Sequence, residues 1–334
     1  MAQRIYLDHA ATSPLRPEAR AAMEGGFALW ANPSSPHAEG RKAKQKLEDA
    51  RERIKRALGL GQGEKEYELI FTSGASEALW IALNRSKAKR RIVSAVEHDA
   101  VFRAAPNAEV VADETVFDPE SLLAIQHVNS ETGTINPVEP MAESVGEAGI
   151  TVLSDCAQSA GKLDLPKADM LVVSAHKFGG PIGIGALLVR DFNLLEPMGG
   201  HERGYRQGTE NLLGALGMAA ALETGEWATT ADDRAAFAST IALDRLTIGE
   251  AADYIFALTH PTLSAQALLI RLDAMGFAVS AGSACASGTL KKSRVLDAFG
   301  VPDDIAARTI RVSIGWSTTT EELDAFAEAW RSLI

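Results

Sequence analysis

The sequence predicts an α/β fold in which a mainly parallel sheet is sandwiched by helices, followed by a smaller α+β domain at the C-terminal end. Three observations predict it. Short apolar segments alternate with longer helix-like segments through the middle of the chain. Turns of glycine and other small residues follow several of the apolar segments. The length of 334 residues is large for one hydrophobic core, so two packed domains are expected.

The expected strands are short runs rich in Val, Ile and Leu, at 68–71, 91–94, 124–128, 151–154, 170–173 and 185–189. Helices are expected near 38–58, 75–85, 99–105, 140–149 and 210–224. Beyond Trp227 the composition changes, with an Ala-rich exposed helix from 228, a strand at 310–314 and an amphipathic helix after Thr320. We therefore expect a large domain over 15–222 and a small domain made of 1–14 and 223–334.

Composition and charge exclude several classes of protein. The apolar fraction of 46% and the mean hydropathy of -0.02 are typical of a globular protein, and no apolar run reaches the ~18 residues of a membrane span. The first residues lack the apolar core of a signal peptide, so a cytoplasmic location is expected. A net charge of -11 opposes a broad surface for nucleic acid or anionic membrane.

The chain has two cysteines, Cys156 and Cys285, which cannot by themselves form a disulfide framework or a zinc site. No metal site is expected. Cys285 lies among the small residues 280–288, which have little capacity to form a core, so a mobile loop with a reactive thiol is predicted. Cys156 directly follows an apolar segment and is predicted to be a small buried side chain.

Lys177 occupies an unusual position for a lysine, between the apolar segment 170–173 and a glycine-rich turn. Desolvation of an ammonium group is costly and lowers its pKa. A lysine at the end of a buried strand therefore suits an amine that forms a Schiff base with a carbonyl cofactor. The alternative is a strand-end lysine whose ammonium group simply reaches water.

Ligands of open α/β sheets collect at the carboxyl ends of the strands, where three further groups are found. The small-residue turn 72–77 opens a helix and suits a phosphate, although it also fits a plain helix cap. Asp155 suits a protonated pyridine nitrogen, or a helix cap. His98 supplies an imidazole that can stack on a ring or carry a proton. With Lys177, these groups predict a pyridoxal phosphate site.

These segments together resemble the pyridoxal-phosphate-dependent cysteine desulfurases of aminotransferase class V, which have fold type I. The resemblance covers the chain apart from about 225–265. Its motifs lie at 6–14, 32–37, 71–77, 96–98, 127–133, 155–158, 174–177, 203–209, 280–285 and 310–311. The form of the 280–285 motif resembles the subgroup with a longer, mobile cysteine loop.

The resemblance implies a role for each matching residue. Lys177 would carry the Schiff base, Asp155 would pair with the ring nitrogen and His98 would stack on the ring. Arg311 and Asn32 would bind the substrate. The remaining cofactor contacts implied are Ala75, Ser76, Ser174 and His176 at the phosphate, Gln158 at the phenolic oxygen, and Thr209 at the phosphate of the neighbouring subunit of a homodimer. The family usually has an asparagine where Ser130 stands here, so either Asn129 or Ser130 contacts the phenolic oxygen.

The activity implied is conversion of L-cysteine to L-alanine with transfer of sulfur to Cys285 as a persulfide. An acceptor protein of iron-sulfur cluster assembly or tRNA thiolation would then receive the sulfur. Two alternatives stay open. One is a lyase acting on selenocysteine or another β-substituted amino acid, for which Cys285 is dispensable. The other is a catalytically silent regulatory paralogue.

Overall fold

The computed structural model describes residues 4–61, 66–111, 118–281 and 293–334. Its contacts divide the chain into two compact units. The sheet unit contains Pro14–His127 and Pro137–Gly225, and the terminal unit contains Met1–Ser13, Val128–Asn136 and Glu226–Ile334. The sequence-based division placed the short segment 128–136 with the large domain, whereas the contacts group it with the chain termini.

The sheet unit is built on seven strands in the order β2-β8-β7-β6-β5-β3-β4. Their bounds are Glu68–Thr72 (β2), Gly185–Val189 (β8), Met170–Ser174 (β7), Thr151–Asp155 (β6), Ser121–Gln126 (β5), Arg90–Ser94 (β3) and Glu109–Val111 (β4). Strand β8 runs antiparallel to β2 and β7, and every other pair is parallel. The predicted α/β class with a mainly parallel sheet is confirmed.

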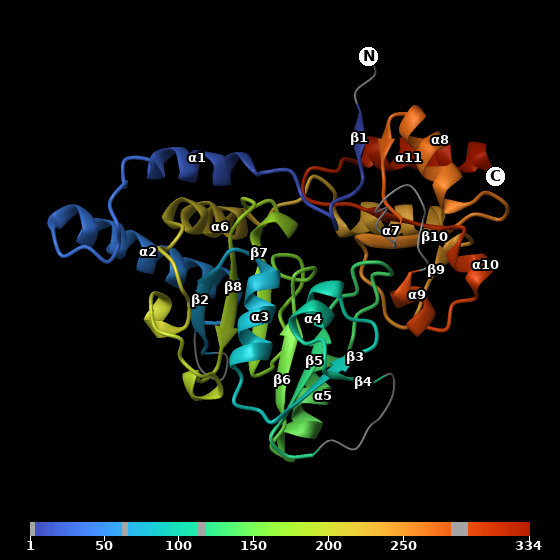
Figure 1. The fold of residues 1–334 in the computed structure, drawn as a ribbon. Helices are drawn as coiled ribbons and strands as arrows, with labels where there is room; N and C mark the ends of the chain where they lie inside the picture. The colour runs from blue at the N-terminus through green and yellow to red at the C-terminus, as the bar shows by residue number, and fades with distance from the viewer. Residues whose placement is uncertain (1–3, 62–65, 112–117, 282–292) are drawn as a thin grey trace. The chain divides into compact units, whose positions relative to one another are not determined.

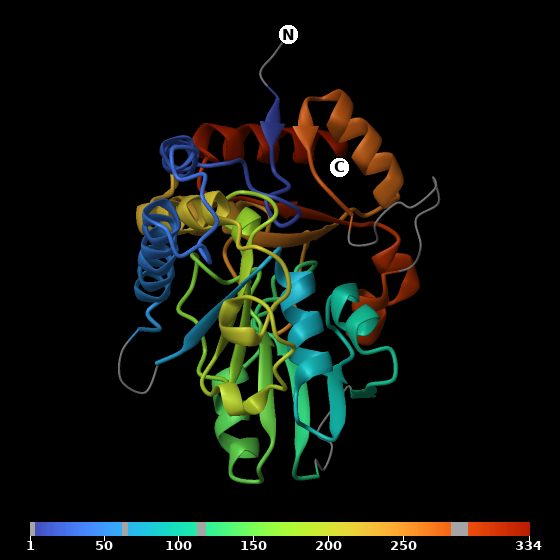
Figure 2. The same ribbon diagram turned by 60° about the vertical axis from the view of Figure 1, so that its left-hand side comes forward.

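Helices cover both faces of this sheet (Figures 1 and 2). On one face lie α2 (Ala38–Ala57), α5 (Val138–Gly146) and α6 (Leu212–Thr224), with α1 (Pro17–Gly26) packed on α6. On the other lie α3 (Ala75–Arg85) and α4 (Asp99–Ala104). The side chains of β7 alternate between the two faces. Leu171 and Val173 pack in the core under α2 and α6, and Met170 and Val172 pack in the core under α3. A strand buried on both faces has this continuous apolar sequence.

Some expected elements are displaced and others were not predicted. Strand β5 begins at Ser121, three residues before the predicted start, because a fully buried serine opens the strand. Helix α5 begins directly after Pro137 and ends at Gly146, short of the predicted end at 149. Short elements such as α1 and β4 were missed, since they carry too few apolar residues to produce a clear period.

The terminal unit is an α+β arrangement. Its strands form an antiparallel sheet, β12-β10-β9, and a parallel pair, β1-β11. Their bounds are Ile5–Tyr6 (β1), Arg245–Leu246 (β9), Ile255–Thr259 (β10), Phe277–Ala278 (β11) and Thr309–Ser313 (β12). The helices are Ala231–Thr240 (α7), Ala265–Ala274 (α8), Arg294–Ala298 (α9), Asp303–Ala306 (α10) and Thr320–Leu333 (α11). Phe237, Phe256, Phe326 and Trp330 form its aromatic core.

Within the described ranges, no helix combines the length and apolar character needed to cross a bilayer.

Candidate active site

One edge of the seven-stranded sheet gathers the carboxyl ends of its strands. Because only β8 runs in the opposite direction, β2, β7, β6, β5 and β3 all end there. We call it the carboxyl edge. Asp155 ends β6, Lys177 follows β7 and His98 follows β3. The charges of these three groups act on one another, which places them in one cluster as the sequence led us to expect.

Asp155 presents a buried carboxyl group at this edge. One carboxylate oxygen, Oδ1, accepts the backbone N–H of Ala157 at 2.9 Å. Burial raises the pKa of Asp155 above its ordinary value, while the Ala157 N–H, the His98 ring when it is protonated and the Lys177 ammonium group oppose that rise. A further N–H donor carrying positive charge would therefore stabilise the carboxylate. A protonated pyridine nitrogen is such a donor.

His98 caps the first turn of α4. Its Nδ1 accepts the backbone N–H of Ala100 at 3.2 Å, so the proton of the neutral ring lies on Nε2. Protein atoms around the ring exclude water and lower the pKa of His98, although Asp155 acts to raise it. The imidazole is therefore neutral at pH 7 and offers one N–H donor.

Lys177 ends a single 3₁₀ turn, Ala175–Lys177, directly after β7. The turn is tight, because a Cβ added at Gly180 would lie 2.8 Å from the Cβ of Ala175. Ser174 before it is buried, and His176 and Lys177 are half-buried. The chain therefore leaves the sheet through a compact corner that presents Ser174, His176 and Lys177 in succession.

The turn before α3 has the close backbone packing that a phosphate cradle needs. Gly74 has φ 151°, and a Cβ there would lie 3.7 Å from the hydroxyl Oγ of Ser174. A Cβ at Gly185 would lie 2.8 Å from the Cα of Gly74. The end of β7, the start of β8 and the turn thus meet without intervening side chains. Helix α3 begins at Ala75, and the N–H groups of its first turn have no acceptor within the helix, so Ala75 and Ser76 are suited to a phosphate.

Glu77 was missed as a functional residue, although it lies inside the 71–77 motif. One of its carboxylate oxygens accepts the backbone N–H of Ser73, and the other pairs with Nε of Arg206 at 3.0 Å. Glu77 thereby ties the turn before α3 to the loop that leads to Thr209. Its signal in the sequence is a carboxylate in the first turn of a helix, which is common in helices without such a role.

The other predicted residues lie at separate places. Gln158 is buried in the turn after Asp155, whereas Thr209 is exposed in the loop before α6. Asn32 is exposed between α1 and α2, and its Oδ1 accepts the N–H of Ser34 at 2.8 Å. Asn129 and Arg311 belong to the terminal unit. Cys285 lies outside the described residues, and its role stays a prediction.

The two alternatives at 129 and 130 have different local roles. The Oδ1 of Asn129 accepts the N–H groups of Glu131 and Thr132 at 2.9 and 3.0 Å, which closes a turn. The backbone carbonyl of Ser130 accepts Nη1 of Arg311 at 2.9 Å. Asn129 is therefore engaged in local structure, and the contact of either residue with the cofactor stays a prediction.

The low pKa of His176 predicts that stability declines as the medium becomes acidic. Burial, with the nearby charges of Lys177 and Lys162, lowers the pKa of His176 to about 4. Because the unfolded chain binds the proton more readily, the free energy of unfolding should fall as pH drops from ~6.5 towards 4. Urea denaturation at several pH values should show a smaller fall for His176→Gln. Equal slopes for the two proteins would contradict this prediction.

The two cysteines should differ in reactivity, because Cys156 is fully buried between β6 and the following turn. Burial raises the pKa of the Cys156 thiol to about 12, so almost none is thiolate at neutral pH. Iodoacetamide applied to the native protein should label Cys285 and leave Cys156 unmodified, as read by peptide mass spectrometry. Labelling of both cysteines in urea serves as the control. Native labelling of Cys156 would contradict the prediction.

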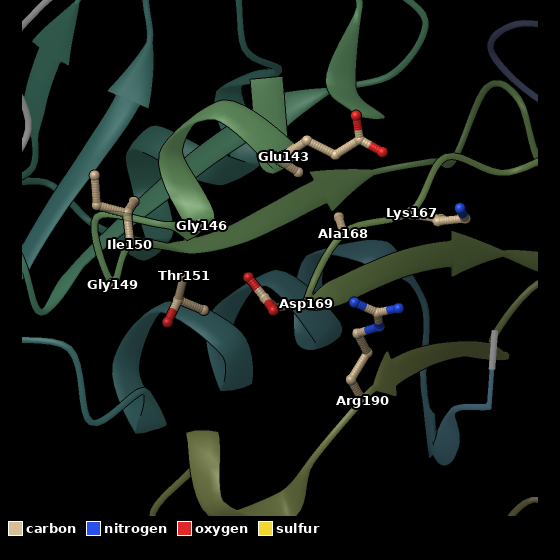
Figure 3. Close-up of a pocket in the computed structure, with 10 residues that line it drawn as sticks. Glu143, Gly146, Gly149, Ile150, Thr151, Lys167, Ala168, Asp169 and Arg190 are labelled. Carbon is tan, nitrogen blue, oxygen red and sulfur yellow. The ribbon is translucent and has the colours of Figure 1, made fainter. Parts of the chain in front are cut away.

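A hollow of about 370 Å³ lies at the opposite edge of the sheet, where β6 and β7 begin (Figure 3). Lys167 and Arg190 contribute positive charge to its wall, and Glu143 and Asp169 contribute negative charge. One oxygen of Asp169 accepts the backbone N–H of Val152 at 2.7 Å. The hollow is separated from the carboxyl edge by the length of the strands and contains none of the predicted site residues.

The family profile, a curated relative and a solved structure all relate this chain to the same family. The aminotransferase class-V profile matches residues 5–326. A cysteine desulfurase IscS of Dictyoglomus turgidum is 33% identical over 381 aligned positions, covering 97% of this chain and 93% of that protein. An X-ray structure of a NifS-like protein from Rickettsia africae superposes with a TM-score of 0.86 at 26% identity, covering 99% of each chain. The structure of SspA in complex with cysteine gives 0.79 at 29% identity, covering 94% of this chain and 99% of that one.

Proposed function

Because the chain belongs to the aminotransferase class-V family and, within it, to the cysteine desulfurases, we propose that it converts L-cysteine to L-alanine with pyridoxal phosphate as cofactor. The sulfur passes to Cys285 as a persulfide. The observation that carries the proposal is the cluster of an acid, an imidazole and an amine at the carboxyl edge, formed by Asp155, His98 and Lys177.

The residues of the carboxyl edge fit the proposed cofactor. When bound, pyridoxal phosphate supplies an electron sink for the charge left on the α-carbon of an amino acid. Asp155 would hold a proton at the ring nitrogen of the cofactor, and His98 would offer its neutral imidazole for stacking. The phosphate is assigned to Ala75, Ser76, Ser174 and His176, with Thr209 of a second subunit, and the phenolic oxygen to Gln158 with Asn129 or Ser130.

Lys177 and Arg311 have different roles: one transfers protons and the other binds the substrate. The amine of Lys177 takes the proton from the α-carbon and returns one to the skeleton of the product, as general base and acid. Arg311 binds the substrate carboxylate through the fork of its guanidinium group, and Asn32 provides a polar contact. His98 can donate its Nε2 proton nearby.

Cys285 completes the reaction. Its thiolate attacks the sulfur of the bound cysteine, a sulfur-sulfur bond forms and the bond between that sulfur and the β-carbon breaks. The β-carbon receives a proton and alanine leaves, so no external oxidant or reductant is needed. An acceptor protein of iron-sulfur cluster assembly or tRNA thiolation then takes the persulfide sulfur, in the cytoplasm.

The proposal is tested by incubating the purified protein with pyridoxal phosphate and L-cysteine. We expect release of alanine and, by mass spectrometry, the gain of one sulfur atom on Cys285. Cys285→Ser should lose the added sulfur, while the matched variant Cys156→Ser should keep it. A protein that stays colourless with pyridoxal phosphate and releases no alanine would refute the proposal. If the protein releases alanine from L-selenocysteine and not from L-cysteine, the substrate is selenocysteine.

The proposed homodimer predicts an apolar contact surface on the sheet unit. Phe27 and Ile182 are 66% and 79% exposed. Both side chains lie beside the first turn of α6. Gly26, which precedes Phe27, packs against Leu213, and the carbonyl of Gly183, which follows Ile182, accepts Nδ2 of Asn211 at 3.2 Å. The double variant Phe27→Glu/Ile182→Glu should be monomeric in light scattering after gel filtration.

The control for this surface is Leu243→Glu, which alters a fully exposed leucine of the terminal unit. This variant should keep the mass of the unmodified protein. Dimers that survive both glutamates would contradict the proposed surface.

A further inference from the structure

The contacts around Arg311 point to a role for Asp8, a residue that has no part in the proposed function. Arg311 lies in β12, paired on one side with Ala257 of β10 and on the other with Ser280. Its side chain is 11% exposed. The guanidinium Nη2 donates to Oδ1 of Asp8 at 2.8 Å, and Nη1 donates to the backbone carbonyl of Ser130 at 2.9 Å. Two segments far apart in the chain thus hold its two outer nitrogens.

Asp8 is itself rigidly placed. The backbone on either side is bonded to two strands: Leu7 N–H to Ala278 at 2.9 Å and His9 N–H to Ser313 at 3.2 Å. Both carboxylate oxygens are engaged, since Oδ2 accepts the hydroxyl of Ser280 at 3.0 Å while Oδ1 accepts Arg311. A carboxylate fixed at both oxygens cannot rotate freely, so it sets the direction of the guanidinium group that it binds.

We propose that Asp8 is a positioning residue for Arg311, holding the guanidinium fork ready for the carboxylate of the amino-acid substrate. This inference rests on the proposed function. Each Nη carries two N–H groups, so the contacts to Asp8 and Ser130 leave further donors on both nitrogens. A pre-oriented arginine loses less side-chain freedom when it binds a ligand, and the gain in affinity is made before the chemical step.

The effect of Asp8 could instead be one of charge. A carboxylate next to Arg311 neutralises part of its positive charge and would weaken its attraction for a substrate carboxylate. The two roles predict opposite results. If Asp8 positions Arg311, its removal raises the KM for L-cysteine. If Asp8 only reduces the charge, both Asp8→Ala and Asp8→Asn lower KM, and the proposal is overturned.

The experiment measures kcat and KM of the holoenzyme for L-cysteine. We expect Asp8→Ala to raise KM by about 10- to 100-fold, the range of a charge-assisted hydrogen bond, with kcat changed less than about threefold. Asp8→Asn keeps an oxygen that can accept from Arg311, so its KM should lie closer to that of the unmodified protein. Ser280→Ala frees the second oxygen and should raise KM by a few-fold.

A double-mutant cycle separates positioning from a general structural role. In an Arg311→Ala background, Asp8→Ala should have no further effect on KM, because its partner is already gone. Additive effects, or an unchanged KM in Asp8→Ala, would overturn the inference while alanine release by the unmodified protein leaves the proposed function standing. Should Asp8→Ala not fold, the same comparison is made with Asp8→Asn and Ser280→Ala. If the unmodified protein releases no alanine, the proposed function itself fails.

Discussion

Replacing Lys177 with alanine will lower kcat for alanine release by at least roughly 10³-fold, because one side chain is proposed both to carry the cofactor and to move the α-proton. The loss should appear in single-turnover measurements as well as in steady state. The matched control is Lys167→Ala, which removes the same charge at the opposite edge of the sheet, beside the hollow of Figure 3. This variant should keep the kcat of the unmodified protein.

A second readout links the loss to the amine itself. A small primary amine such as ethylamine, added to Lys177→Ala, should restore part of the lost rate, because it can carry protons in the space that the side chain leaves. Rescue should be absent in Asp155→Ala, where the amine is intact. A Lys177→Ala protein with more than a tenth of the original kcat would contradict the assignment of Lys177 as the catalytic base.

The grouping of His98, Asp155 and Lys177 could be predicted from sequence because each residue lies at the end of a strand or within four residues after it. The rule that parallel strands end at one edge converts three local positions into one site without any knowledge of packing. The strands themselves were recognisable, since burial on both faces gives runs such as Met170–Ser174 a continuous apolar composition. Strand β5 was misplaced at its start because Ser121 opens it.

The contacts that hold the site in place could not be predicted in the same way. Asp8 and Arg311 are 303 positions apart, and only the pairing of β12 with the segment after β1 brings them together. Glu202 and Arg203 adopt positive φ angles of 48° and 57°, which sequence patterns reserve for glycine or asparagine. Such a conformation is maintained by tertiary contacts, and here Glu202 is held by its buried bonds to Arg51.

Arg51 of α2 and Glu202 form a buried ion pair, with side chains 3% and 1% exposed. Glu202 accepts Nη1 and Nη2 of Arg51 at 2.8 and 3.1 Å, and it also accepts the backbone N–H of Phe71 at 2.8 Å. Burial acts to lower the pKa of Arg51, but the bonds to Glu202 and Glu48 outweigh it and raise that pKa. The carboxylate thus joins a helix, the end of β2 and the loop that leads to Thr209.

Glu202→Ala is expected to lower the free energy of unfolding by about 3 kcal/mol, because it removes the buried carboxylate that pairs with Arg51 and leaves that charge only the exposed Glu48. Urea denaturation measures the change. The control is Arg53→Ala, on the same helix, whose pair with Glu223 has side chains 27% and 40% exposed and should contribute less than about 1 kcal/mol. Equal losses in the two variants would show that the buried pair contributes no more than an exposed one.

Replacing both partners with leucine sharpens the test. Removal of a complete buried ion pair is often nearly neutral, since neither charge is left without a partner. Glu202 also accepts the N–H of Phe71, and a leucine at this position has no acceptor. The double variant would therefore leave one buried donor unsatisfied, at a cost of about 1–3 kcal/mol. The double variant should therefore recover only part of the stability lost in Glu202→Ala. Full recovery would mean that neither the ion pair nor the bond to Phe71 adds net stability, and that the loss in Glu202→Ala comes from the Arg51 charge left behind in the interior.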